Sequence, residues 1–333
     1  MNKRLFPLVI LGFACLFMCN SCKKSGNKEI DPEFARYIAA FTYGKVSSTS
    51  DIQIELTQDL PNVELNKEIE GNLFEFSPSI KGKAYWTGTR NIKFVPEPGE
   101  LKAGQEYDAW FRLDKVLDVE SDFKEFYFYF KVPEQNFKVS LLPYSPIKDN
   151  DLIWNTVQGS VNLADDAPLE NVKQMFSLSG DGAKDAKVKI IPTEVKGRYN
   201  IVIDSLRREA QARSYMLKID GASISAKNTE EISIPIAQTS STSFEVVDVR
   251  MAYDPQECIR ITFSDPLSVN QNIQGLVSPN GVDNFSYDIQ KNVLRLFLDN
   301  YKGGSNINLS IFRELKNFDN TPLDKSYTYS VNF

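Results

Sequence analysis

Histidine is absent from the 333 residues of this chain. The absence excludes Ser-His-Asp and Cys-His nucleophile systems, histidine-ligated zinc sites and acid–base catalysis by imidazole. It leaves carboxylate chemistry and calcium binding open, but no motif for either is present. We therefore expect no enzymatic activity, no catalytic residue, no cofactor and no metal site.

Cysteine is scarce as well. Cys15, Cys19 and Cys22 lie close together near the amino terminus, and Cys258 is the fourth. Each folded domain must therefore be stabilised by its hydrophobic core rather than by disulfides, and 42% hydrophobic residues are sufficient for this. Basic residues are outnumbered by acidic ones, 38 to 44, and form no basic patch, so nucleic acid is not an expected partner.

The apolar run at the amino terminus, Leu5–Met18, is too short to span a bilayer, which takes about 20 apolar residues. Lys3 and Arg4 precede it, and a charged start before a short apolar stretch is typical of a signal peptide. The next segment, Asn20–Lys23, places a small residue directly before Cys22. This arrangement resembles the lipobox of bacterial lipoproteins and implies that Cys22 carries the lipid.

The resemblance implies that residues 1–21 are removed and that residues 22–33 form a flexible lipidated tether. Cleavage before Cys15 or Cys19 and an ordinary secretory leader are the alternatives. We expect a lipid anchor in the cell envelope, with the membrane as a partner. In the lipoproteins that this segment resembles, surface export goes with acidic residues just after the cysteine. Lys23–Ser25 lacks them, so the resemblance implies the periplasmic side rather than surface exposure.

A strand pattern repeats about every hundred residues along the rest of the chain. Each unit starts with a strand of alternating apolar and polar residues that runs into an acidic turn with proline. A strand pair follows about forty residues later, and one more strand closes the unit. The predicted strands are 52–56, 91–95, 107–111 and 126–130 in the first unit, 157–163, 200–203, 215–219 and 232–236 in the second, and 259–263, 294–298, 307–311 and 327–331 in the third.

Many short alternating strands with turns between them indicate an all-β chain of three tandem antiparallel β-sandwich domains. We place these domains at residues 34–135, 136–242 and 243–333. Only residues 34–41 carry a possible helical face, and a strand fits them equally well. We prefer the strand because it completes the first sandwich.

The first unit resembles a bacterial immunoglobulin-like (Ig-like) domain in the segments Phe76–Trp86, Asn91–Pro96 and Leu101–Tyr107. In the last of these, Gly104 is expected to permit a tight corner. Tyr107 is expected to bury its ring while its hydroxyl reaches a loop carbonyl.

Two further segments, Tyr37–Ser47 and Trp154–Val161, resemble the amino-terminal part of bacterial alpha-2-macroglobulins. These lipoproteins begin with a row of macroglobulin-type sandwiches and trap proteases. The resemblance implies that this chain is the amino-terminal, structural segment of such an inhibitor, with proteases reached through further regions. The family's Cys-x-Glu-Gln thioester is missing, and Cys258 is expected to be a partly buried strand thiol. A short anchored Ig-like binding protein, either an adhesin or a glycan-binding protein, is the alternative function.

Other clusters have simpler explanations than a binding or catalytic site. We interpret Asp149–Asp151 and Asp165–Asp166 as turn residues rather than calcium ligands. Glu97, Glu100 and Glu106 surround a hairpin turn and do not suggest a glycosidase pair. We interpret the charged run Arg207–Arg213 as a solvated turn.

The aromatic residues allow two interpretations. Trp86, Trp110 and Trp154, together with Tyr85 and the aromatic strand 126–130, would suit a carbohydrate platform. We prefer core packing or an interface with the next domain, because residues 126–130 are aromatic on both faces of the strand.

Overall fold

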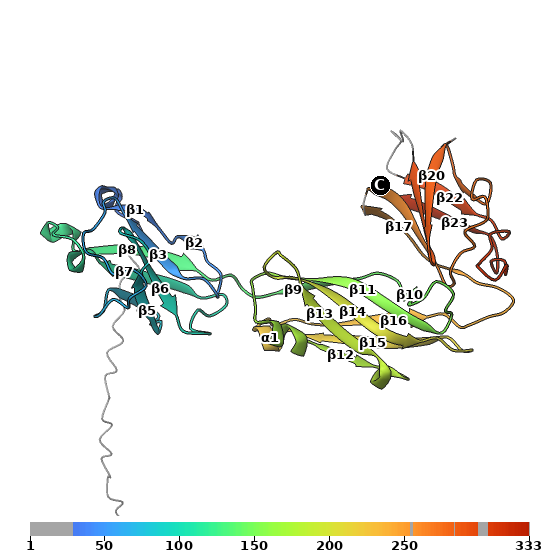
Figure 1. The fold of residues 1–333 in the computed structure, drawn as a ribbon, viewed down its shortest axis with the longest axis horizontal. Coiled ribbons are helices and arrows are strands. Elements are labelled where there is room, and N and C mark those ends of the chain that lie inside the picture. The colour runs from blue at the N-terminus through green and yellow to red at the C-terminus, as the bar shows by residue number, and fades with distance from the viewer. Residues whose placement is uncertain (1–28, 254–255, 283, 299–305, 333) are drawn as a thin grey trace, which may run out of the picture.

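The computed structural model describes residues 29–253, 256–282, 284–298 and 306–332, which form three bodies in a row (Figure 1). Each body has its own hydrophobic core, and we call them domains 1, 2 and 3. Domain 3 is turned away from the line of the first two (Figure 1). The cores lie inside the proposed domain ranges, whose end points stay predictions. The buried core residues run from Phe34 to Val132, from Phe137 to Ile236 and from Phe244 to Val331.

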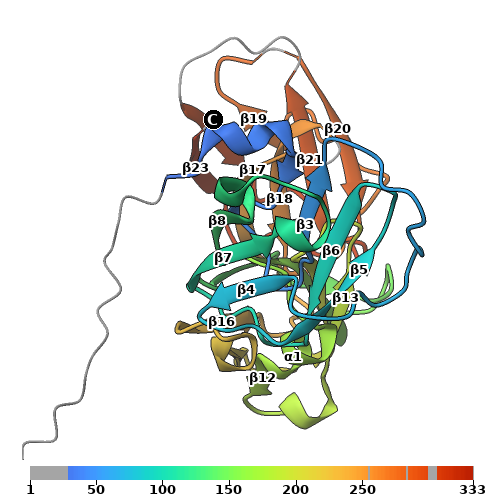
Figure 2. The same cartoon turned by 90° about the vertical axis from the view of Figure 1, so that its left-hand side faces the viewer.

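Domain 1 consists of two four-stranded sheets packed face to face, and Figure 2 looks onto this domain along the row. Three 3₁₀ turns accompany the strands, at Pro32–Arg36, Leu113–Lys115 and Ser121–Phe123. One sheet has the order β1 (Ile38–Phe41), β3 (Ile52–Leu56), β6 (Asn91–Pro96), β5 (Gly82–Trp86). The other has the order β2 (Gly44–Lys45), β8 (Glu125–Lys131), β7 (Glu106–Arg112), β4 (Phe74–Ser77).

Domain 2 repeats this plan with a five-stranded and a three-stranded sheet. Its one short helix, α1, covers Leu169–Gln174, and 3₁₀ turns lie at Ala183–Asp185 and Gly221–Ile224. The larger sheet contains β9 (Phe137–Leu141), β10 (Ser145–Pro146), β11 (Trp154–Leu163), β14 (Arg198–Arg207) and β13 (Lys187–Pro192). The smaller sheet has the order β12 (Phe176–Ser179), β15 (Arg213–Asp220), β16 (Thr229–Ile236).

Domain 3 has a four-stranded and a three-stranded sheet. The first has the order β17 (Val246–Tyr253), β18 (Glu257–Phe263), β21 (Val293–Leu298), β20 (Phe285–Gln290). The second has the order β19 (Val277–Pro279), β22 (Asn306–Ile311), β23 (Tyr327–Asn332). Cys258 on β18 is 2% exposed, which is more buried than we expected.

The strand order of each domain is that of an Ig-like sandwich. Such domains place strands A, B, E and D in one sheet and C, F and G in the other. In domain 3 these are β17, β18, β21 and β20 against β19, β22 and β23, and the other two domains follow the same order. The prediction of tandem antiparallel β-sandwiches is therefore confirmed.

The segment 34–41, for which we preferred a strand, is divided between two structures. Residues Pro32–Arg36 form a 3₁₀ turn, because Asp31 accepts a hydrogen bond from the Glu33 amide and proline suits the first helical position. The strand begins only at Ile38, where pairing with β3 begins. The strand prediction is thus wrong for the first half of the segment and correct for the second.

The corner predicted at Tyr107 is present. Tyr107 is 1% exposed, its hydroxyl donates to the Glu100 carbonyl at 3.0 Å, and the Lys102 amide donates to that hydroxyl at 2.9 Å. Gly104 has a φ of 77°, which glycine adopts without strain. Tyr215 on β15 makes the equivalent corner in domain 2, where its hydroxyl accepts from the Arg207 amide at 3.1 Å. Both are the tyrosine corner of Ig-like domains.

Candidate functional site

The predicted lipidation site, Cys22, lies outside the described residues, as does the leader of residues 1–21. The anchor therefore stays a prediction. Over the ranges that the structure covers, no helix is long and apolar enough to cross a membrane.

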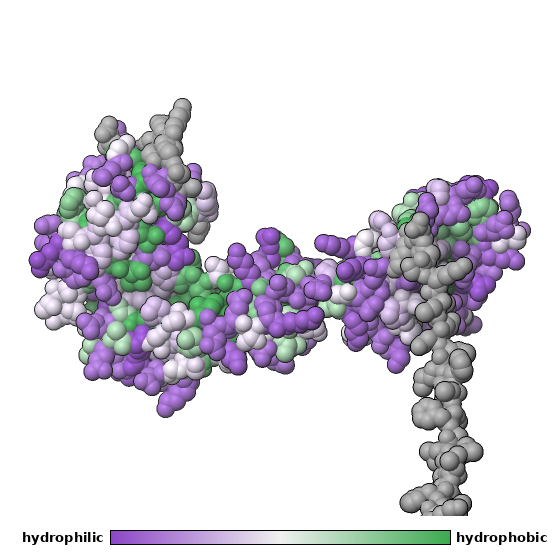
Figure 3. All heavy atoms as spheres, turned by 180° about the vertical axis from the view of Figure 1, so that it is seen from behind, coloured by the Kyte–Doolittle hydropathy of each residue, from purple (hydrophilic) through white to green (hydrophobic). Residues whose placement is uncertain are grey.

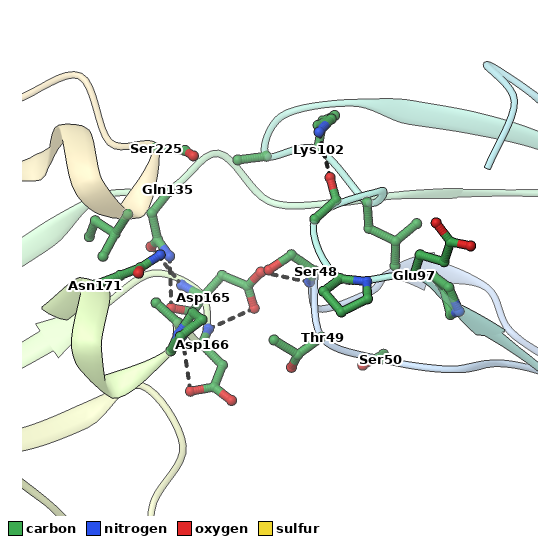
Figure 4. A pocket seen from close by; sticks show the side chains of 18 of the residues that line it. Ser48, Thr49, Ser50, Glu97, Lys102, Gln135, Asp165, Asp166, Asn171 and Ser225 are labelled. Carbon is green, nitrogen blue, oxygen red and sulfur yellow. Dashed lines mark hydrogen bonds between the residues drawn. The ribbon is translucent and has the colours of Figure 1, made fainter. Parts of the chain in front are cut away.

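A cleft of about 600 Å³ lies between domains 1 and 2 (Figure 4). Loops of domain 1 meet loops of domain 2 across it, and its lining mixes hydroxyls, amides, carboxylates and prolines. The domain 1 loops are residues 48–51, 95–99 and 101–103, and the domain 2 loops are residues 165–168 and 223–225.

Asp165 lines this cleft and joins the two domains. Its Oδ2 accepts a hydrogen bond from the Ser48 amide of domain 1 at 2.7 Å, and its Oδ1 accepts from the Asp166 amide at 2.9 Å (Figure 4). The linker residue Gln135 holds the backbone of Asp165, donating to its carbonyl at 2.9 Å and accepting from its amide at 3.0 Å. Burial alone would raise the pKa of this carboxyl, but the hydrogen bonds from Ser47, Ser48 and the Asp166 amide lower it below its usual value. Asp165 is therefore an ionised joint residue.

The acidic turns bind backbone amides, as the turn interpretation predicted. Asp166 accepts from the Ala167 amide at 3.1 Å, and Asp151 accepts from the amides of Ile153 and Trp154 at 2.8 and 3.1 Å. Across the part of the chain that the structure describes, no three carboxylate or thiol side chains come together in a group that could hold a metal ion.

Arg208 contradicts our prediction that residues 207–213 form a solvated turn. It is 2% exposed and reaches from domain 2 into domain 3, where Nη1 donates to Asp265 Oδ1 at 2.6 Å and to the Ser264 carbonyl at 2.8 Å. The rest of the guanidinium donates to the carbonyls of Ala237 and Gln238 at 2.9 and 2.6 Å. The prediction is correct for the exposed Arg207 and residues 210–212 and wrong for Arg208, because charge alone does not reveal burial when partners from two domains surround an arginine.

Asp265 is fully buried and completes this network from the side of domain 3. Its Oδ1 also accepts from the Ser264 hydroxyl at 3.0 Å, and its Oδ2 accepts from the Asn317 side chain at 3.0 Å. Both carboxylate oxygens are thus used. A buried ion pair is stable only when such additional hydrogen bonds satisfy the charges.

A second contact between domains 2 and 3 is made by the turn between β20 and β21. The Asn292 side chain donates to the carbonyls of Tyr144 and Phe263 at 3.0 and 2.7 Å, and it accepts from the Ser145 hydroxyl at 2.9 Å. The neighbouring Lys291 donates to the Pro146 carbonyl at 3.0 Å. Hydrophobic residues also gather on the surface where domain 3 meets domain 2 (Figure 3). Arg208 and Asn292 bind neighbouring residues at the end of β18, so the two sets of hydrogen bonds form one continuous contact between the domains.

The three tryptophans lie in three different environments and do not form one platform. Trp86 packs against the core of domain 1, and Trp154 is 38% exposed on domain 2, with the Arg207 guanidinium 5.9 Å from its ring centre. Trp110 lies on the outer face of β7, beside Tyr127 of β8 at 5.7 Å between ring centres.

The strand 126–130 is aromatic on both faces, but only one face lies in the core. Phe126, Phe128 and Phe130 are at most 1% exposed, whereas Tyr127 and Tyr129 are half-buried on the outer face. Core packing was therefore correct for the phenylalanines. Core packing does not hold for the two tyrosines, which lie outside the core of domain 1.

No family model and no curated protein matches this sequence. Solved structures of multidomain Ig chains are similar over most of its length. The I9–I11 tandem from titin has 11% identity and a TM-score of 0.23, and covers 87% of this chain and 94% of its own. A titin I67–I69 variant has 8% identity, a TM-score of 0.22 and coverages of 88% and 96%. The eight amino-terminal Ig domains of Down Syndrome Cell Adhesion Molecule have 9% identity, a TM-score of 0.22 and coverages of 89% and 48%.

TM-scores this low do not establish a common fold. The Ig-like assignment rests on the strand order of the domains instead. The sequence offered no signal for the contact between domains 2 and 3, because Arg208 and Asp265 are 57 residues apart.

Proposed function

We propose that this chain is a non-catalytic, lipid-anchored support in the cell envelope. Tandem Ig-like domains would hold the parts attached to them at a set position relative to the membrane. The observation that carries this proposal is the joint between domains 2 and 3, where Arg208 and Asp265 form a buried ion pair and Arg208 makes four hydrogen bonds. Interdomain contacts generally allow motion unless the interface is large and hydrophobic. At this joint a change of angle would separate a buried ion pair and leave each charge without its partner, which is costly, so the pair supports a fixed angle.

The joint between domains 1 and 2 is built differently from the joint between domains 2 and 3, and it supports a different role for each joint. Only four residues separate the buried Val132 of domain 1 from the buried Phe137 of domain 2, which limits the range of motion. A single carboxylate, Asp165, bridges the domains there, and a cleft adjoins it. We propose that this joint bends while domains 2 and 3 move as one unit.

Small-angle X-ray scattering of the full chain tests the support role. The proposal predicts a scattering curve that a fixed domain 2–domain 3 unit fits, and a larger spread of dimensions in Arg208→Met. If the wild type already needs freely rotating domains 2 and 3 to fit its curve, the chain is not a fixed support.

The anchor at Cys22 has its own test. A Cys22→Ala variant should move from the membrane fraction to the soluble periplasmic fraction, because the acyl chains are its proposed means of attachment. Unchanged membrane association would contradict the lipoprotein assignment.

The resemblance to bacterial alpha-2-macroglobulins suggests a finer role, in which these domains support a protease trap. Members of that family are several times longer than this chain. An antibody against domains 1 to 3 should then detect a native polypeptide several times larger than 37.8 kDa in cell extracts. A native band near 37.8 kDa would contradict the protease-trap role but not the support role.

The second candidate function is that of a short anchored binding protein, and the aromatic outer face of domain 1 favours it. An adhesin or a glycan-binding protein would need such an exposed face, whereas a pure support would not. A glycan array and a pull-down with the full chain separate these roles, because a pure support should retain no ligand.

A further inference from the structure

The outer face of β7 and β8 carries a continuous row of aromatic rings, which we call the aromatic face. It consists of Tyr43, Tyr129, Tyr127 and Trp110. Neighbouring ring centres in this order are 5.4, 6.4 and 5.7 Å apart. Tyr43 is 56% exposed, and the other three are half-buried.

The same face of domains 2 and 3 provides an internal comparison. The equivalent strands of domain 2 point Ser214, Lys218 and Ser233 outward, with Met216 as the largest apolar side chain, and those of domain 3 point only asparagine, serine and threonine outward. The Ig-like fold is thus built twice in this chain without aromatic residues at these positions. Folding does not explain the aromatic face, and clustered exposed rings mark interaction sites.

Hydrogen bonds hold the rings of the aromatic face in position. The Tyr127 hydroxyl donates to Asp108 Oδ1 at 2.7 Å, and the hydroxyls of Tyr43 and Tyr129 lie 3.2 Å apart. Rigid tyrosine and tryptophan rings give contact area at a low cost in conformational entropy.

The charges around the aromatic face identify the partner. Glu75 is the cross-strand partner of Trp110, Asp108 precedes it by two residues on the same face, and Glu125 is two residues before Tyr127. Cations lie at both ends of the row rather than at its centre. Arg112 is held in a two-bond contact by Asp114 at 3.1 and 3.2 Å, and Lys131, two residues after Tyr129, is the cross-strand partner of Glu106 and lies beside Lys45 of β2. The face is therefore acidic at its centre, on a chain whose net charge is −6.

We propose that the aromatic face of domain 1 binds an arginine- or lysine-bearing segment of a partner protein. A cationic side chain placed over tryptophan or tyrosine is attracted by the ring face, and the surrounding carboxylates add long-range attraction. The chain itself contains such a contact, because the Arg36 guanidinium lies 4.3 Å from the ring centre of Phe123.

Two measurements on the full chain test the proposal. The probe is an alternating glycine–arginine octapeptide, with an alternating glycine–glutamate octapeptide as its counterpart. Fluorine NMR of the 5-fluorotryptophan-labelled chain resolves three tryptophans, and we expect the arginine peptide to shift the Trp110 signal while the Trp86 and Trp154 signals stay in place. Titration calorimetry should show weaker binding at higher salt and no binding of the glutamate peptide.

Variants locate the binding on the face. Trp110→Gln and Glu75→Gln should each weaken binding of the arginine peptide, Trp110→Gln by roughly fivefold or more. Trp154→Gln is the matched control, because Trp154 is an exposed tryptophan with an arginine beside it on another domain, and it should leave the affinity unchanged. The unshifted signals of Trp86 and Trp154 in Trp110→Gln show that the variant is folded.

Three results would overturn the proposal. They are an arginine peptide that shifts no signal, equal binding of both peptides, and a chitin hexasaccharide that shifts Trp110 where the arginine peptide does not. The last result would identify the face as a glycan site. The scattering test of the joint between domains 2 and 3 is independent of all three.

Discussion

Replacing Arg208 by methionine tests how much the buried ion pair stabilises the joint between domains 2 and 3. Methionine keeps the apolar stem but removes four hydrogen bonds to Asp265 and to the carbonyls of Ser264, Ala237 and Gln238. The Asp265 carboxylate then stays buried without its cation. Leaving one member of a buried pair alone costs about 3–5 kcal/mol.

A cost of this size is large compared with the stability of a domain. For a unit of about 200 residues, 1 kcal/mol lowers Tm by about 2–4 °C, so we expect a fall of the order of 10 °C. Differential scanning calorimetry should show this fall in the transition of domains 2 and 3 and no change in the transition of domain 1.

A matched control and a double variant complete the experiment. Arg207→Met removes the neighbouring arginine, whose side chain is 57% exposed, and should cost less than about 1 kcal/mol. Adding Asp265→Asn to Arg208→Met should recover part of the loss, because no uncompensated charge then remains buried. A Tm for Arg208→Met within a degree or two of the wild type would refute the reasoning.

Three further predictions concern the corner, the core and the first joint. Tyr107→Phe should destabilise domain 1 by about 1–2 kcal/mol in urea unfolding, because the Lys102 amide and the Glu100 carbonyl lose their partner; an unchanged midpoint would contradict this. Phe128→Ala should cost about 3–5 kcal/mol in the same assay, since the ring is fully buried. Because hydrogen bonding lowers the pKa of Asp165, the ionised form stabilises the joint above the carboxyl's ordinary pKa, and that contribution is lost as the pH falls through the lowered value. Scattering from the full chain should therefore broaden below about pH 4, and Asp165→Asn should show the broadened form already at neutral pH.

The sequence predicted the strands and the corner well, because both depend on local patterns. Alternation at Ile52–Leu56 placed β3 with its observed ends, since one face of that strand is buried and the other is not. The Leu-x-x-Gly-x-x-Tyr spacing placed Tyr107 in a corner because glycine and tyrosine have specific backbone and hydrogen-bonding roles there.

What the sequence did not predict depends on contacts between distant residues. Arg208 stands in a run of charged residues, and its burial follows only from the approach of Asp265 in the next domain. The outer position of Tyr127 and Tyr129 depends on which face of β8 meets the core. Residues 126–130 are all aromatic, so the sequence does not indicate which face is buried.

The distance between domains 2 and 3 in solution tests the proposed support most directly. Spin labels at Glu231→Cys on β16 and Ser330→Cys on β23 occupy exposed strand positions, while Cys258 is 2% exposed and protected from labelling. Pulsed electron double resonance on the chain carrying Cys15→Ser, Cys19→Ser and Cys22→Ser should give one narrow distance distribution, which broadens when Arg208→Met is added. A wild-type distribution as broad as that of the variant would contradict a fixed joint and, with it, the proposed support.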